Sequence, residues 1–159
     1  MTRKNFLATA GLSAFSISAF GSVRPGAGDL FVADCATAND ILGPFYRPDA
    51  PLRQDLTSPG LPGSVIQLSG TVFGADCTTP LVGALIEIWH CDTRGEYDNE
   101  SADFQLRARW ITNEAGTYSF RTILPGKYLN GEKYRPAHIH YRVTAPDSRE
   151  LISQLYFHG

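Results

Sequence analysis

Two histidines, His138 and His140, stand one residue apart in the segment YRPAHIHYRV, which otherwise has the residue types of a β-strand. Because side chains alternate between the two faces of a strand, both imidazoles and Arg142 are predicted to point one way and Ile139 the other. Two neutral imidazoles on one face can bind a metal ion side by side, but they do not identify the metal. An isolated pair of this kind is more often a polar, solvated sheet face, so the rest of the chain has to decide.

Tyrosines are the other candidate ligands, and two of them fall in long predicted connections. Tyr97 lies in DTRGEYDNESADFQL, and Tyr128 lies in LPGKYLNGEKYRP. A phenol has a pKa of about 10, so it binds a metal at neutral pH only if a strongly Lewis-acidic cation displaces its proton. Fe(III) fits this requirement better than Zn(II), because two phenolates offset two of its three charges.

Short alternating segments are predicted to position these residues on an all-β scaffold. Each segment is rich in β-branched or aromatic residues and is bounded by Gly, Pro, Asn or Asp. The predicted strands are residues 65–73, 84–91, 107–112, 117–123, 138–145 and 151–157. Such spacing predicts an antiparallel β-sandwich or barrel, with the turn NEAG closing a hairpin through a positive φ at Gly116. The chain stops directly after the last of these segments, so we expect C-terminal strands of the sandwich to be missing.

Length and composition are typical of one globular domain. The chain has 159 residues, of which 43% are hydrophobic, and this suffices for a sizeable core. The formal net charge is −2, and the Lys and Arg residues are scattered. Nucleic acid is therefore not an expected partner.

Residues 1–29 are predicted to be an export signal and linker, and residues 30–159 the folded domain. The signal has a basic start followed by a small-residue and apolar run. Its TRKNFL segment is similar to a twin-arginine signal in which Lys4 replaces the second arginine. An ordinary secretory signal or an amphipathic first helix are the alternatives. We expect a periplasmic or extracellular protein with no membrane insertion once the signal is removed.

The turn-rich segment 35–56 contains too many prolines for a helix or a central strand, so it is predicted to be an arm lying over another part of the fold.

Three cysteines in an exported chain suggest one disulfide and one spare thiol. Cys35 to Cys77 is the favoured pair, because a simple hairpin would place Cys91 far past the end of the strand that carries Cys77. Three buried free thiols are the alternative.

Four blocks of this sequence, in the same order, resemble the intradiol ring-cleavage dioxygenases, the protocatechuate and catechol dioxygenase family. The blocks are GALIEIWHCDTRGEY, GTYSFRTILPGKY, YRPAHIHYRVTAP and LISQLYF, and the resemblance runs from about Ile41 to the end. It implies a β-sandwich that holds a non-haem Fe(III) ion through two tyrosinates and two histidines. The ligands it implies are Tyr97, Tyr128, His138 and His140.

The resemblance also implies catalytic roles for Arg135, Gln154 and Tyr128. Arg135 would stabilise negative charge that develops during the reaction, and Gln154 would be a hydrogen-bonding group in the substrate pocket. Tyr128 would leave the metal when substrate binds and act as a base. The segment GPFYRP, which contains Tyr46, is similar to the arm that borders the active site in this family. His90, in WHCD, is expected to make a local hydrogen bond and not to bind metal.

The implied activity is cleavage of a catechol-type ring with O2 to a cis,cis-muconate-type diacid. The implied partners are the small-molecule substrate and O2, and a homo-oligomer is one expected assembly. A non-catalytic binding module of the transthyretin-like or carboxypeptidase-regulatory-like type is the alternative, because SGTVFGADCTTPLVGALIEI is similar to such modules. A copper or zinc cupin-like enzyme is a third interpretation, against which two tyrosine ligands argue. The choice of catechol stays open.

Overall fold

The computed structural model describes residues 23–25, 31–33 and 36–158. The chain divides into two compact units, Met1–Cys35 and Ala36–Gly159. In the first unit, β1 (Val23–Pro25) and β2 (Phe31–Ala33) pair antiparallel. Residues 1–22 of the predicted export signal, Cys35 and Gly159 lie outside the described residues.

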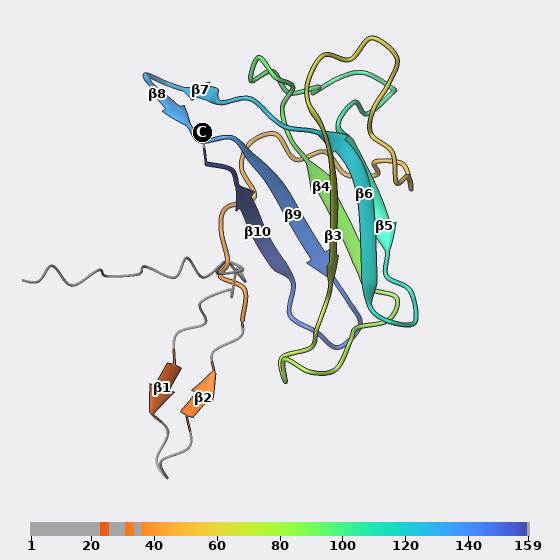
Figure 1. The fold of residues 1–159 in the computed structure, drawn as a ribbon, viewed down its shortest axis with the longest axis vertical. Coiled ribbons are helices and arrows are strands. Elements are labelled where there is room, and N and C mark those ends of the chain that lie inside the picture. Colours follow the sequence, from red (N-terminus) through yellow and green to blue (C-terminus); the bar gives the residue numbers. More distant parts are fainter. Residues whose placement is uncertain (1–22, 26–30, 34–35, 159) are drawn as a thin grey trace, which may run out of the picture. The chain divides into compact units, whose positions relative to one another are not determined.

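The second unit is built from antiparallel strands, and residues 36–158 contain no helix, hence none that could cross a membrane (Figure 1). The strands are β3 (Val65–Thr71), β4 (Leu85–Trp89), β5 (Arg107–Ile111), β6 (Thr117–Ile123), β7 (Tyr128–Asn130), β8 (Lys133–Arg135), β9 (His138–Thr144) and β10 (Leu151–Tyr156). One sheet has the order β10-β9-β4-β5, and β3 pairs with β6 in a second sheet. The predicted all-β, antiparallel β-sandwich is confirmed.

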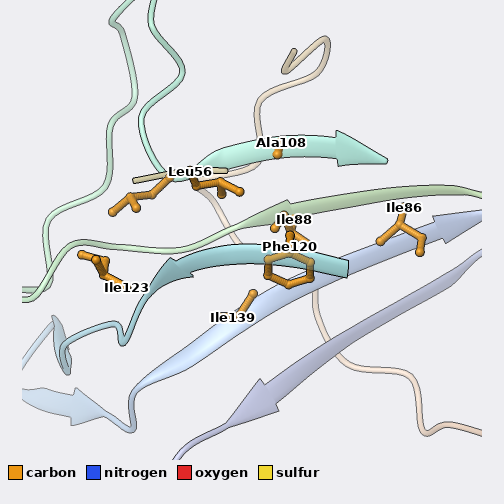
Figure 2. Close-up of a cluster of buried hydrophobic side chains, with 8 residues drawn as sticks. Leu56, Ile86, Ile88, Ala108, Phe120, Ile123 and Ile139 are labelled. Atoms are coloured by element: carbon orange, nitrogen blue, oxygen red, sulfur yellow. The ribbon is translucent and has the colours of Figure 1, made fainter. Parts of the chain in front are cut away.

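The core lies between these two sheets (Figure 2). Ile86 and Ile88 of β4, Ile139 of β9 and Phe120 of β6 are buried there in one cluster. Removing an isoleucine side chain of this kind from water stabilises the fold by about 1.5 to 3 kcal/mol. Ile139 is completely buried on the inner face, as the alternation of the HIH segment predicted.

The arm, residues 36–56, lies for most of its length on the outer face of the four-stranded sheet, and it ends beside β6, where the Leu56 N–H donates to the Arg121 carbonyl at 2.9 Å and the Leu56 side chain joins the core. It begins at the edge strand β10, where the Asp40 N–H donates to the Ile152 carbonyl at 2.8 Å. It reaches the opposite edge at β5, where the Arg109 N–H donates to the Pro51 carbonyl at 2.9 Å. The arm therefore crosses the face to which β9 presents its two histidines, and the prediction that it covers another part of the fold is confirmed.

A short hairpin replaces part of a connection that was predicted to be irregular. β7 and β8 pair antiparallel, and Tyr128 lies opposite Arg135 at the base of this hairpin. Gly131 and Glu132 form the two-residue turn between the strands, and Gly131 has a φ of 63°. The strands were missed because three residues are too few to show an alternating pattern.

The cysteines agree in part with the predicted arrangement. Cys77 is disulfide-bonded, but its predicted partner lies outside the described residues. Cys77 also lies in a turn with a φ of 65° and not on a strand. Cys91 is a free, buried thiol whose pKa is raised to about 11 by burial, so it is a structural and not a reactive cysteine.

Candidate metal centre

Two loops bring Tyr97 and Tyr128 together. Asp92 shapes the first loop, since its carboxylate accepts a hydrogen bond from the Glu96 N–H at 2.9 Å. Gly95, between them, has a φ of 86°, and a Cβ there would lie only 2.9 Å from the Cα of Tyr128. A side chain at this position would push the two loops apart, so glycine is required for their close approach.

The structure places all four predicted metal ligands in one cluster. The Nε2 atoms of His138 and His140 lie 3.2 Å apart, and the Tyr97 hydroxyl oxygen lies 3.5 Å from the His138 Nε2. The Tyr128 ring centroid is 5.6 Å from the ring centroids of both Tyr97 and His138. Residues from one loop and from the strands β7 and β9, up to 43 positions apart, thus converge on one point.

His138 presents an unprotonated nitrogen to this point. The His138 Nδ1 lies 2.6 Å from the Pro136 carbonyl, which can only accept, so Nδ1 carries the proton and Nε2 keeps its lone pair. The His140 ring instead stacks on Trp89, and within the described residues its buried Nδ1 has no hydrogen-bond partner. Burial lowers the pKa of His138 and lowers that of His140 to about 3, so both imidazoles are neutral at pH 7.

The spacing of these donors fits a shared metal ion. Two nitrogens bound to one ion at about 2.1 Å, with ligand angles between tetrahedral and octahedral values, lie about 3.0 to 3.4 Å apart. The observed Nε2 to Nε2 distance of 3.2 Å falls within this range. Burial raises the pKa of Tyr97, so only a strongly Lewis-acidic cation would displace its proton.

Tyrosine oxygens are essential to this interpretation. Among the described residues, no group of three or more His, Cys, Asp and Glu side chains could hold a metal ion. A metal bound at His138 and His140 would therefore take its anionic ligands from Tyr97 and Tyr128. Such a donor set suits a hard, trivalent ion better than a divalent one.

The arm contributes an aromatic residue that the sequence did not single out. The ring of Phe45 stacks on that of Tyr97, with centroids 4.2 Å apart and an angle of 15° between the planes. The neighbouring Tyr46, which we had placed beside the site, donates its hydroxyl hydrogen to Glu87 at 3.0 Å and accepts from Arg142 at 2.8 Å. Tyr46 thus anchors the arm to the sheet, and Phe45 contacts the candidate ligand.

The predicted catalytic residues Arg135 and Gln154 are also brought together. The Arg135 Nη2 donates to the Gln154 Oε1 and to the Tyr156 hydroxyl, each at 2.9 Å. Tyr156 in turn donates to the Asp40 carboxylate at 2.8 Å, and its ring lies 5.6 Å from that of His138. Tyr156 and Asp40 were missed, although Tyr156 lies two positions after Gln154 on the same strand face.

His90 behaves as a structural residue, as expected. Its Nδ1 lies 2.8 Å from the Cys91 carbonyl and its Nε2 lies 2.8 Å from the Thr122 hydroxyl. Only 1% of its surface is exposed. Both ring nitrogens are therefore engaged by hydrogen bonds and are not available to a metal.

Comparison with known proteins decides the family. Residues 41–159 match the family model described as Dioxygenase. The catechol 1,2-dioxygenase of Candida albicans is 33% identical over 76% of this chain, and the chlorocatechol 1,2-dioxygenase of Rhodococcus opacus is 34% identical over 93% of it. The chain belongs to the intradiol ring-cleavage dioxygenase family. The resemblance predicted from the sequence is thereby confirmed.

A solved structure shares the fold of this intradiol dioxygenase chain. It is the dioxygenase domain of a dioxygenase and carbohydrate-binding protein fusion from Streptomyces sp. SirexAA-E, with 39% identity and a TM-score of 0.69. The match covers 77% of this chain and 75% of that one. The matches to the Candida and Rhodococcus enzymes cover 46% and 64% of their lengths, so this chain spans less than two thirds of either.

Proposed function

We propose that this protein is a non-haem Fe(III)-dependent intradiol dioxygenase that cleaves a catechol-type ring with O2 to a cis,cis-muconate-type diacid. The observation that carries the proposal is the approach of the His138 and His140 Nε2 atoms to 3.2 Å, with the Tyr97 hydroxyl 3.5 Å from His138. Membership of the intradiol family supports the reaction type. The names of the relatives, catechol and chlorocatechol 1,2-dioxygenases, support the substrate class.

Tyr97, Tyr128, His138 and His140 would hold the ferric ion. When bound there, Fe(III) supplies the Lewis acidity that promotes ionisation of a catechol and makes its ring open to attack by O2. Two phenolate ligands favour the ferric over the ferrous state, because they offset two of its three charges.

The protein's own side chains would handle charge and protons around the substrate. The Arg135 guanidinium can stabilise negative charge on the substrate oxygens. Gln154 and Tyr156 fix its guanidinium by hydrogen bonds of 2.9 Å. The Tyr128 side chain, in its phenolate form, would accept a proton from a substrate hydroxyl. The ring of Phe45 would exclude water from the Tyr97 side of the site.

We also propose that the protein is exported to the periplasm or the extracellular space. The basic start and the apolar run within residues 1–29 support this location. The proposed chemistry is compatible with it, because ring cleavage by this route consumes O2 and needs no external electron donor. A homo-oligomeric state stays a prediction.

The test is to load the purified protein with Fe(III) and record its visible spectrum and its O2 uptake with catechol. Tyrosinate-to-iron charge transfer should colour the protein, and Zn(II), with its filled d shell, should not. Tyr97→Phe should weaken or abolish the band, whereas Tyr118→Phe, which alters a ring packed on Phe120 in the sandwich interior, should keep it. Colourless protein that binds stoichiometric zinc and consumes no O2 would contradict the proposal and favour a binding module.

A further inference from the structure

Arg107 is a buried cation to which the proposed reaction assigns no role. It is the first residue of β5, and only 1% of its surface is exposed. Burial lowers its pKa to about 10, and within the described residues it forms no ion pair. A buried guanidinium that is stabilised only by the more distant charge of Asp98 is costly, so its retention indicates a function beyond packing.

The hydrogen bonds of Arg107 all lead to the surroundings of Tyr97. Its Nε donates to the Asp98 carbonyl at 2.7 Å and its Nη2 donates to the Asn99 Oδ1 at 3.1 Å. Both acceptors belong to the residues that directly follow Tyr97. Its Nη1 donates at 2.5 Å to the carbonyl of Phe45, whose ring stacks on Tyr97. One side chain therefore fixes both the backbone after Tyr97 and the ring packed against it.

The charge of Arg107 also matches the form of Tyr97 that would bind a metal. Tyr97 is half-buried, so a phenolate there has less water to stabilise it than at the surface. In such surroundings a fixed positive charge attracts the phenolate more strongly than it would in water. All three Arg107 acceptors are neutral oxygens, so its positive charge is not offset by them.

We propose that Arg107 is a positioning residue for Tyr97: it holds the Tyr97 loop and the Phe45 ring in place and provides the positive charge that a metal-bound phenolate would face. This inference rests on the proposed function, because it assigns Tyr97 to a metal. It adds a residue outside the ligand set, on a strand for which the sequence predicted no functional residue.

Arg109 provides a matched control. It lies two residues further along β5, on the same face, and its Nε also donates to a carbonyl of the arm, that of Ala50. Its ion pair is with Asp49, with a nitrogen-to-oxygen distance of 3.5 Å. Arg109 therefore holds the arm in a similar way but makes no contact with the residues around Tyr97.

The experiment compares Arg107→Met, Arg107→Lys and Arg109→Met with the wild-type protein. Iron affinity is measured by competition with a chelator, and the tyrosinate-to-iron band by visible absorption. We expect Arg107→Met to weaken Fe(III) binding by about 10- to 100-fold, the usual effect of losing a group that orients a metal ligand, and to shift the band. Arg107→Lys should show a smaller loss with a shifted band, because lysine keeps the charge but not the planar fork. Arg109→Met should match the wild type.

The inference is overturned if both Arg107 variants bind iron and absorb as Arg109→Met does. Circular dichroism checks that each variant is folded. If Arg107→Met does not fold, Arg107→Lys decides, since an unchanged band and affinity there also overturn the inference. Wild-type protein that binds no Fe(III) would overturn the proposed function and this inference with it. If the wild-type protein binds Fe(III) and the Arg107 variants keep its iron affinity and its visible band, only the role of Arg107 is overturned.

Discussion

The indole ring of Trp89 lies parallel to the imidazole ring of His140, with centroids 4.7 Å apart and 6° between the planes. His138 and His140 are thus oriented by different means. The Pro136 carbonyl fixes the ring of His138 by a hydrogen bond of 2.6 Å, whereas the His140 ring is held by stacking on a buried neighbour. Because metal-binding histidines usually rely on a hydrogen bond at the second nitrogen, Trp89 takes over this orienting role at His140.

Replacing Trp89 should therefore affect the metal site. Trp89→Leu removes the aromatic face, and we expect about a tenfold loss of iron affinity, in line with the loss of a group that orients a ligand. Trp89→Phe keeps a ring against His140 and should lose less. Trp110→Leu is the control, because Trp110 packs on the hydrophobic core of the sandwich. Equal iron affinity in all three variants, measured by chelator competition, would show that stacking does not orient His140.

The two faces of β9 should respond differently to substitution. His138→Ala and His140→Ala should each lower iron content sharply, because each removes a predicted ligand. Ile139→Ala should leave the ligands in place but cost about 2 to 5 kcal/mol of stability, since it opens a cavity at a completely buried position. Elemental analysis and chemical denaturation separate these effects. Full iron content in both histidine variants would mean that the HIH segment is only a polar sheet face.

Arg135→Lys should impair turnover more than iron binding. Lysine keeps the positive charge but cannot reproduce the planar guanidinium, whose Nη2 contacts both Gln154 and Tyr156 at 2.9 Å. Arg149→Lys, at an exposed position, serves as the control. Steady-state O2 uptake and iron content are measured on the same preparations. A parallel loss of iron and activity in Arg135→Lys would assign Arg135 a structural role instead.

His90 should make the stability of the metal-free protein depend on pH. Burial lowers the pKa of His90 from 6.5 to about 4, so the folded state binds fewer protons than the unfolded state between these values. The contribution of neutral His90 to the free energy of unfolding is therefore fully present above pH 6.5. It is lost as the pH is lowered towards 4, and the total loss is about 3 kcal/mol.

Denaturant unfolding at several pH values tests this expectation. His90→Asn should be less stable at pH 7, because it loses ring packing, but its stability should fall less between pH 6.5 and 4 than that of the wild type. His158→Asn, at an exposed position, should keep the wild-type pH dependence. The same slope in the wild type and His90→Asn would show that His90 does not carry the effect.

Much of the scaffold could be predicted because strand periodicity is a local property. The alternation of His138, Ile139 and His140 directly separates the site face from the core face, and the structure agrees. The turn before Thr117 was predictable for the same reason, since Gly116 supplies the positive φ, here 67°, that the hairpin needs. Tyr97 and Tyr128 were singled out by their place in two long connections and then by the family resemblance, and not by strand periodicity.

The residues that were missed depend on contacts between distant parts of the chain. Arg107 reads as an outward-facing strand residue, and it becomes buried only because the arm, with Phe45 located 62 positions earlier, covers that face. Trp89 reads as a core aromatic, and its contact with His140 depends on the register in which β4 pairs with β9. Neither the path of the arm nor this register is visible in a local pattern.

The hydrogen bonds of two arm arginines to the Tyr97 loop and the start of β5 use main-chain oxygens as acceptors, beside one ion pair between Arg47 and Asp98. Arg47 donates to the carbonyls of Asp98 and Ser101, and Arg53 donates to those of Asp103 and Arg107. Every amino acid provides a carbonyl, so these contacts place no demand on the side chains at the acceptor positions. Over evolutionary time, side chains at acceptor positions such as Ser101 and Asp103 can be exchanged while these contacts with the arm are retained. A lineage with this architecture can reshape the space beside Tyr97 by point mutation without having to evolve a new attachment.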